Sequence, residues 1–189
     1  ESSFGFNTLA IVNNKPKTCS LKDFLESFLK FREDVVIKKT KFELKKAEIR
    51  AHILIGLSVS VENLDKIIKI IRSSKNPDLA KKSLMSTKWK ISKSQKFLKL
   101  IENKKNSNAY SLSKEQVDAI LELRLQKLTA LGISEIEEEI NKLANLIIKL
   151  KKIISSKKEL LKVISDELNE IKNKYSVPRR TQIIDAVLN

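Results

Sequence analysis

The chain has 189 residues, of which 41% are hydrophobic and 32% charged, a balance that excludes a disordered chain and allows one or two folded domains. Glycine and proline occur three times each, which favours a nearly all-helical protein because both residues interrupt helices. The net charge of +15 indicates a polyanionic partner, either nucleic acid or an anionic membrane. A composition in which lysine is the usual surface residue explains the same charge, so the charge alone does not establish a polyanionic partner.

The rare reactive residue types limit the chemistry of the chain. Cys19 is the single cysteine, which excludes a disulfide within the chain and favours a reducing compartment. Because His52 is the single histidine, a Cys/His metal site cannot form, and there is no glycine-rich phosphate loop. The sequence has no signal peptide and no apolar run of about 18 residues. We expect a piece of a longer protein, with no metal site of its own and no membrane partner.

Residues 1–20 are predicted to form a β-hairpin. Residues 8–12 are rich in β-forming side chains, Asn13-Asn14 fits a turn, and residues 15–18 return as the second strand. Pro16 places this second strand at an edge, because proline cannot donate a hydrogen bond to a neighbouring strand.

A long helix is predicted over residues 21–56, with Ser20 as its cap and Asp23 in its first turn. Apolar residues recur along it every seven positions, and further apolar residues lie on the same side. This pattern is typical of a coiled-coil seam that faces a partner helix. The repeat comprises Leu21, Phe28, Val35, Phe42 and Ile49, with Phe24, Leu25, Phe31 and Ile53 beside it.

A second helical arm is predicted over residues 135–175. Its apolar residues alternate at spacings of four and three, so that one stripe faces a partner. They are Ile136, Ile140, Leu143, Ile147, Leu150, Ile154, Leu161, Ile164, Leu168, Ile171 and Tyr175. Lys157 interrupts the stripe, and Ser156 with Glu159 forms a capping box. We therefore favour two stacked helices with a break near 155–157, and one continuous helix is the alternative.

Residues 57–134 are predicted to form a small helical head between the arms. Its helix starts are marked by Asn76 before Pro77, by Ser92 with Gln95 and by Ser113 with Gln116. The predicted helices span 64–72, 77–85, 93–102 and 114–128, with a polar loop at 103–109 and a connection at 129–133.

Together these elements predict an all-α fold with a short β-hairpin near its N-terminus. About 80 residues separate the arms, so the arms can pack antiparallel as a coiled-coil pair with the head at the tip. Parallel packing would require the connection to travel back along the full length of an arm. Residues 176–189 are predicted to be a return segment after the second arm.

Several runs of residues, in order and at compatible spacing along the whole chain, carry a family signature. They are Phe4-Gly5-Phe6-Asn7, Leu21-Lys22-Asp23, Val35-Val36-Ile37-Lys38-Lys39-Thr40, Arg50-Ala51-His52-Ile53-Leu54, Ala119-Ile120-Leu121-Glu122-Leu123-Arg124-Leu125-Gln126-Lys127-Leu128-Thr129 and Arg179-Arg180-Thr181. Together they resemble the A subunits of bacterial type IIA topoisomerases. The residues of the 119–129 run favour DNA gyrase, and topoisomerase IV is the alternative. Three places depart from the family pattern, namely Ile55, Gly132 and Ser176-Val177-Pro178, where the family usually has Glu, Glu and an approach containing Gly-Asp.

The resemblance implies the exit gate of the enzyme. In the family, two long helices descend from the DNA gate, and the head at their tip pairs with its twin in a homodimer. The A subunit works with the B subunit in an A2B2 holoenzyme that passes one DNA duplex through a transient double-strand break, with ATP and Mg supplied through the B subunit. An independent basic coiled-coil adaptor that binds DNA is the remote alternative.

The resemblance also implies that the catalytic residue lies outside this chain. The family's tyrosine attacks a DNA phosphodiester from an Arg-Tyr-Thr context, which this sequence lacks. Tyr175 lies on the predicted seam, where packing is expected, and Tyr110 precedes a capped helix, where a structural or interface role is expected. We expect Trp89 to pack in the head and His52 to be an ordinary helix residue with local hydrogen bonds rather than a ligand or a base.

Two sets of residues are predicted to carry function. The resemblance implies a cavity between the arms that holds the transported duplex, and basic walls would attract DNA without reading its sequence, although solvated helix flanks explain the same charges. The predicted DNA-facing residues are Arg32, Lys38, Lys39, Lys41, Lys45, Arg179 and Arg180. The predicted dimer contact comprises Tyr110, Leu123, Leu128, Leu131 and Ile133, on and around the last helix of the head, unless these apolar groups close the core of the head itself.

Overall fold

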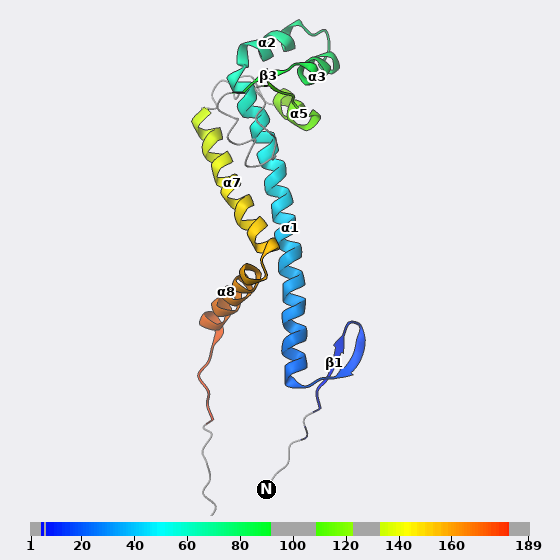
Figure 1. The fold of residues 1–189 in the computed structure, drawn as a ribbon, viewed down its shortest axis with the longest axis vertical. Coiled ribbons are helices and arrows are strands. Elements are labelled where there is room, and N and C mark those ends of the chain that lie inside the picture. Colours follow the sequence, from blue (N-terminus) through cyan, green and yellow to red (C-terminus); the bar gives the residue numbers. More distant parts are fainter. Residues whose placement is uncertain (1–4, 6, 92–108, 123–132, 182–189) are drawn as a thin grey trace, which may run out of the picture. The chain divides into compact units, whose positions relative to one another are not determined.

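The computed structural model describes residues 5, 7–91, 109–122 and 133–181, and the described elements are predominantly helical, as predicted. The chain divides into two compact units. Unit 1 comprises Glu1–Lys39 with Ile153–Asn189, and unit 2 comprises Thr40–Lys152. The elements, labelled in Figure 1, are β1 (Leu9–Val12), β2 (Lys15–Thr18), α1 (Leu21–Glu62), α2 (Leu64–Ser73), α3 (Pro77–Ser86), β3 (Trp89–Lys90), β4 (Ala109–Tyr110), α5 (Lys114–Glu122), α7 (Ile133–Ser155) and α8 (Lys157–Tyr175).

The hairpin of unit 1 forms as predicted. β1 and β2 pair antiparallel, with Val12 opposite Lys15 and Ile11 opposite Pro16. Asn13 and Asn14 both have positive φ angles, of 52° and 60°. Two consecutive left-handed residues make the tight turn whose twist matches that of the flanking strands, and asparagine tolerates this conformation better than most residues.

Helix α1 begins at the predicted cap and runs six residues beyond its predicted end at 56. Ser20 Oγ accepts a hydrogen bond from the Asp23 backbone N–H at 3.2 Å, and an Asp23 carboxylate oxygen accepts one from the Ser20 N–H at 2.9 Å. This reciprocal pair satisfies two amides that no helical carbonyl can reach. At the other end of α1, β-branched residues have a weak helix propensity and favour an earlier helix end, but Ile55 and Val59 are fully buried. Their burial outweighs weak local propensity and extends the helix.

The predicted seam of α1 is wrong. The seven-residue repeat lies largely on the exposed side, where the side chain of Leu21 is 70% exposed and that of Phe42 is 69% exposed. The buried face includes Val36, Thr40, Ala47, Ala51 and Leu54, none of which belongs to the predicted repeat. Several of these side chains are small, which lets a neighbouring helix approach closely. Spacing alone favoured the larger phenylalanines.

Helices α7 and α8 end and begin where the break was predicted. Ser156 lies between them in an extended conformation, and its hydroxyl accepts a hydrogen bond from the Glu159 N–H at 3.5 Å. The buried residues of α7 include Ile136, Ile140, Ala144, Ile147 and Leu150, largely as predicted.

The apolar stripe of α8 differs from the prediction. Leu160 and Ile164 are buried, whereas the predicted Leu161 is exposed together with Leu168 and Ile171. Tyr175, also predicted to pack, has an exposed fraction of 66%, and the ammonium of Lys174 lies 5.3 Å from the centre of its ring. Leu160 and Ile164 instead join Val36 and Ile153 in the core of unit 1.

Ion pairs connect α1 with a partner helix within each unit, and in unit 2 they show that the two helices run antiparallel. In unit 1, Arg32 pairs with Glu167 and Glu33 pairs with Lys157. In unit 2, Glu48 pairs with Lys151 at 3.0 Å and Arg50 pairs with Glu139 at 2.8 Å. In unit 2 the partner's number falls as the number along α1 rises, which is the signature of an antiparallel pair. In unit 1 Glu167 pairs with Lys39 as well as with Arg32, so these ion pairs connect α1 with α8 without defining a direction.

Unit 2 closes its core around the C-terminal end of α1, against which α2, α3 and α5 pack (Figure 1). The largest buried side chains include Ile55, Ile67, Leu84, Trp89 and Ile120. Trp89 packs in the head as expected, and its indole N–H donates to the Leu84 carbonyl at 3.0 Å. The sequence did not indicate the two-residue pairing of β3 with β4, since strands this short carry no periodicity. The predicted helix 93–102 and the end of 114–128 lie outside the described residues.

We predict that Gly56→Val destabilises unit 2. A Cβ at this position would lie 2.7 Å from Cγ and 2.8 Å from Cβ of the buried Gln116, too close for either chain segment to remain in place. Overpacking of this kind costs about 1–3 kcal/mol. Chemical denaturation measures the loss in free energy of unfolding. Lys46→Val is the matched control, because it adds the same β-branched side chain to an exposed position of α1. An equal loss in both variants would contradict a close-packing role for Gly56.

Candidate functional site

A buried polar cluster joins three elements of unit 2. Gln116, at the start of α5, is fully buried, and its amide N–H groups donate to the His52 carbonyl at 2.7 Å and to the Tyr110 hydroxyl at 2.8 Å. Its amide oxygen accepts from the Ser113 N–H at 3.0 Å. One side chain therefore ties α1, β4 and α5 together. Gly56 leaves the room that this side chain occupies.

His52 belongs to this cluster rather than to a local helix contact. Its Nε2 lies 2.8 Å from the Ser113 hydroxyl, 61 residues further along the chain. The pKa of the Glu115 carboxyl lies below its usual range, because its own backbone N–H and the Ser113 hydroxyl hydrogen-bond to it. These contacts satisfy the polar groups at the start of α5, and they leave the cluster with a structural function.

Tyr110, predicted to lie in the dimer contact, is 4% exposed and hydrogen-bonded to Gln116. The ring therefore packs in the core of unit 2, and the dimer contact stays a prediction. The sequence could not distinguish these roles, because a tyrosine before a capped helix suits both. The predicted contact residues Leu123, Leu128 and Leu131 lie outside the described residues, as does the side chain of Ile133.

The predicted DNA-facing residues differ in how far their charge is compensated. Arg32 and Lys39 both pair with Glu167, at 2.5 Å and 3.6 Å. Lys38, Lys41 and Lys45 are exposed and form no ion pair with any described residue. Their spacing of three and four places these three lysines in one row along α1.

Arg179 and Arg180 follow the end of α8 and are exposed. Neither forms an ion pair within the described part of the chain. Their predicted contact with DNA stays a prediction.

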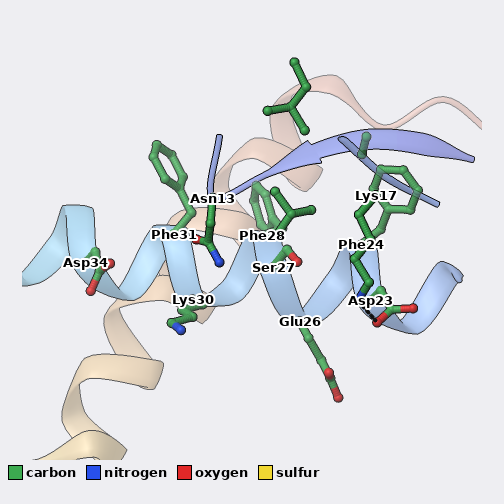
Figure 2. Close-up of a pocket in the computed structure, with 13 residues that line it drawn as sticks. Asn13, Lys17, Asp23, Phe24, Glu26, Ser27, Phe28, Lys30, Phe31 and Asp34 are labelled. Carbon is green, nitrogen blue, oxygen red and sulfur yellow. Dashed lines mark hydrogen bonds and ion pairs between the residues drawn. The ribbon is translucent and has the colours of Figure 1, made fainter. Parts of the chain in front are cut away.

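A pocket in unit 1 lies between the hairpin and the first turns of α1. It has a volume of about 630 Å³ and is lined by Ile11, Asn13 and the aromatic side chains of Phe24, Phe28 and Phe31, among others. Figure 2 shows the three rings on the hairpin side of α1, with Glu26 pointing away. The lining combines aromatic rings with charged side chains, and it contains no group of His, Cys, Asp or Glu side chains able to hold a metal.

Asp23 at the edge of this pocket has a strongly perturbed carboxyl group. Hydrogen bonds from the hydroxyl and the backbone N–H of Ser20, together with Lys17 at 3.1 Å, lower the pKa of its carboxyl to about 2. The same contact raises the pKa of Lys17. In unit 2, Lys81 lies 2.7 Å from Asp118, and this contact raises the pKa of Lys81.

No cluster of three or more His, Cys, Asp or Glu side chains that could hold a metal ion occurs among the described residues. Within the same part of the chain, none of the helices has the length and apolar character needed to cross a membrane.

The geometry thus defines a class of protein: an antiparallel helical pair that carries a small helical head and exposed basic rows. The family model for the A subunit of DNA gyrase/topoisomerase IV matches residues 1–169. The chain therefore belongs to the family formed by the A subunits of DNA gyrase and topoisomerase IV. This agrees with the family resemblance inferred from the sequence.

Individual relatives support the same assignment. The chain is 39% identical to the DNA gyrase A subunit of Clostridium acetobutylicum over 183 residues, which are 97% of this chain and 19% of that protein. It is 39% identical over 186 residues to the gyrase A subunit of Rickettsia felis, covering 97% of this chain and 20% of the relative. It is 40% identical over 181 residues to that of Leptospira biflexa, covering 96% and 19%. The chain thus spans about a fifth of the length of these relatives.

We predict that the Asp23 carboxylate stabilises the start of α1 only above acid pH. Because its pKa is lowered in the folded chain, its contribution is fully present above the unfolded value near 3.8 and is lost as the pH falls towards about 2. NMR titration should follow the Asp23 side chain through this range. Asp23→Asn should remove the change in stability between about pH 4 and pH 2 that this carboxylate causes, whereas Asp34→Asn on the same helix should leave that change in place. A midpoint near the unfolded value for Asp23 would contradict the capping interpretation.

Proposed function

We propose that this chain is the coiled-coil and exit-gate region of a DNA gyrase A subunit. The observation that carries the proposal is the family match across residues 1–169, combined with an antiparallel helix pair that carries a helical head in unit 2. In this role the chain supplies dimerisation and gating, while cleavage depends on residues outside it. The gyrase acts as a type IIA topoisomerase, which passes one duplex through a transient double-strand break and introduces negative supercoils with ATP.

The partners in this proposal are a second copy of the chain, the gyrase B subunit in an A2B2 holoenzyme, and double-stranded DNA. ATP and Mg enter through the B subunit, while the assembly works in the cytoplasm on nucleoid DNA. The net charge of +15 and the row formed by Lys38, Lys41 and Lys45 support contact with a polyanion. Phosphate contacts of this kind hold a duplex without reading its sequence, which suits a protein that transports DNA.

The same region in the A subunit of topoisomerase IV is the second candidate function. The matching family model is described by both enzymes, whereas the three relatives carry the gyrase name. Those names favour gyrase. A basic coiled-coil adaptor is disfavoured, because the match extends over both units rather than over the helical pair alone.

We predict that the chain is a homodimer held by its head, and that Leu131→Glu converts it to a monomer. An interface of about −6 kcal/mol half-associates at roughly tens of micromolar. Light scattering over that concentration range measures the mass, and circular dichroism checks that the helical signal is retained. Leu146→Glu is the matched control, because its side chain on α7 is 41% exposed and lies outside the head.

Three outcomes separate the possibilities. A monomeric Leu131→Glu variant with full helicity supports the dimer gate. Loss of helicity and mass together shows that Leu131 closes the core of the head. An unsubstituted chain that is monomeric at tens of micromolar contradicts the gate proposal for this region.

We also predict that the chain neither cleaves nor rejoins DNA, even when ATP and the B subunit are supplied. The sequence lacks the Arg-Tyr-Thr context of the family's nucleophile. A plasmid assay with denaturing gel analysis detects supercoiling and covalent adducts. Either product from this chain would contradict the assignment of cleavage to residues outside it.

A further inference from the structure

The head of unit 2 carries a strongly basic surface that the proposed function does not use. Between Leu64 and Lys90 there are eight Lys or Arg residues against two Asp residues, whereas the whole chain has 38 against 23. Local charge here is therefore more one-sided than the lysine-rich composition accounts for. The exposed members include Lys66, Lys69, Arg72, Lys82, Lys88 and Lys90.

Helix α2 presents three of these cations on one side. Lys66, Lys69 and Arg72 follow one another at spacings of three, so they are neighbours on the helix surface. They lie on the side away from Ile67, which is buried in the core. At 1.5 Å per residue they span about 9 Å along the helix axis.

Strand β3 extends the same basic surface. The Lys66 ammonium lies 5.2 Å from the centre of the Trp89 ring, so α2 and β3 are adjacent at this point. Asn63, immediately before α2, donates a hydrogen bond to the Lys90 carbonyl at 2.9 Å. The exposed side chain of Lys90 therefore lies beside the start of α2, and α3 packs next to both elements (Figure 1).

The six exposed cations named above are uncompensated, unlike Lys81 of α3, which pairs with Asp118, and unlike many cations on the paired helices. Arg32, Arg50 and Lys151 each pair with a glutamate across the paired helices. In contrast, none of the six head residues forms an ion pair with another described residue. A basic side chain without an acidic partner leaves its full charge available to an external anion, which favours binding over internal stabilisation.

We propose that the surface formed by α2, α3 and β3 binds the phosphate backbone of duplex DNA. Three cations over about 9 Å match the charge density of a duplex, whose strands each carry one phosphate per about 3.4 Å of axis. An anionic membrane fits less well, because membrane surfaces favour aromatic anchors and the indole of Trp89 is only 1% exposed. The inference goes beyond the proposed function, which assigns DNA contact to the lysine row of α1.

The test compares two triple variants of equal charge. Lys66→Glu/Lys69→Glu/Arg72→Glu changes the head, and Lys142→Glu/Lys149→Glu/Lys158→Glu changes the charge by the same amount at exposed lysines of α7 and α8 that have no proposed DNA contact. Fluorescence anisotropy measures binding of each chain to a labelled duplex of about 30 bp between about 50 and 200 mM salt, the range in which phosphate contacts dominate. We expect the head variant to bind at least about tenfold more weakly and its log–log salt slope to become shallower by about 2.7, or about 0.9 per contact.

Each alternative outcome overturns the proposal in its own way. Unchanged affinity and slope in the head variant would show that this surface does not contact DNA. An equal loss in both variants would show a general charge effect. Unsubstituted chains that bind vesicles of anionic phospholipid more tightly than the duplex would identify a membrane as the partner.

Folding and dimerisation are followed separately. Circular dichroism checks the head variant, and if its helicity falls, the neutral Lys66→Gln/Lys69→Gln/Arg72→Gln variant replaces it with the same expected direction. Light scattering reports the dimer of the proposed function. If the unsubstituted chain is monomeric and the head variant still loses DNA binding, the result contradicts the gate proposal and supports DNA binding by this surface. The two proposals therefore fail independently.

Discussion

The structure depends on the one buried face of helix α1. This face supplies Val36 to the core of unit 1 and Ala47, Ala51, Leu54, Ile55 and Val59 to the core of unit 2, so a single helix of 42 residues contributes to both. Much of the face is small, and small side chains allow close packing of an antiparallel partner, which increases the number of dispersion contacts. Ion pairs such as Arg50 with Glu139 border the face and are exposed enough to contribute little to stability. Apolar burial therefore provides most of the stabilisation, and the charges add specificity of alignment.

A second constraint positions the head. The Gln116 side chain is buried with its hydrogen bonds directed to His52, Tyr110 and Ser113, and Gly56 is the residue on α1 that makes room for it. A buried amide is costly when unpaired, so its bonds favour one arrangement of α5 and β4 on α1 over nearby alternatives. For the proposed gate this means that the described part of the head is built as one body around the end of α1. A defined dimer surface requires such a body beneath it.

Charged side chains are arranged differently on the paired helices and on the head. On the paired helices, glutamates such as Glu167 and Glu139 neutralise part of the basic charge and align the helices. On α2 and β3, Lys66, Lys69, Arg72 and Lys90 have no acidic partner among the described residues. In the family to which the chain belongs, a basic surface outside the helical pair would give a transported duplex a further place to bind. Because phosphate contacts weaken steeply with salt, such a surface holds DNA without trapping it.

The sequence by itself determined the features that rest on local chemistry. The hairpin turn at Asn13-Asn14, the caps at Ser20 and Ser156 and the helix starts at Pro77 and Lys114 involve groups within a few residues of one another, so their residue types suffice. Only the tertiary structure decided which apolar stripe is buried. The stripe with Phe42 has better heptad spacing than the one with Ala47, but burial depends on the shape of the facing helix, which periodicity does not contain. Tyr110 shows the same limit, because its partner Gln116 lies on another element and only folding brings the ring into the core.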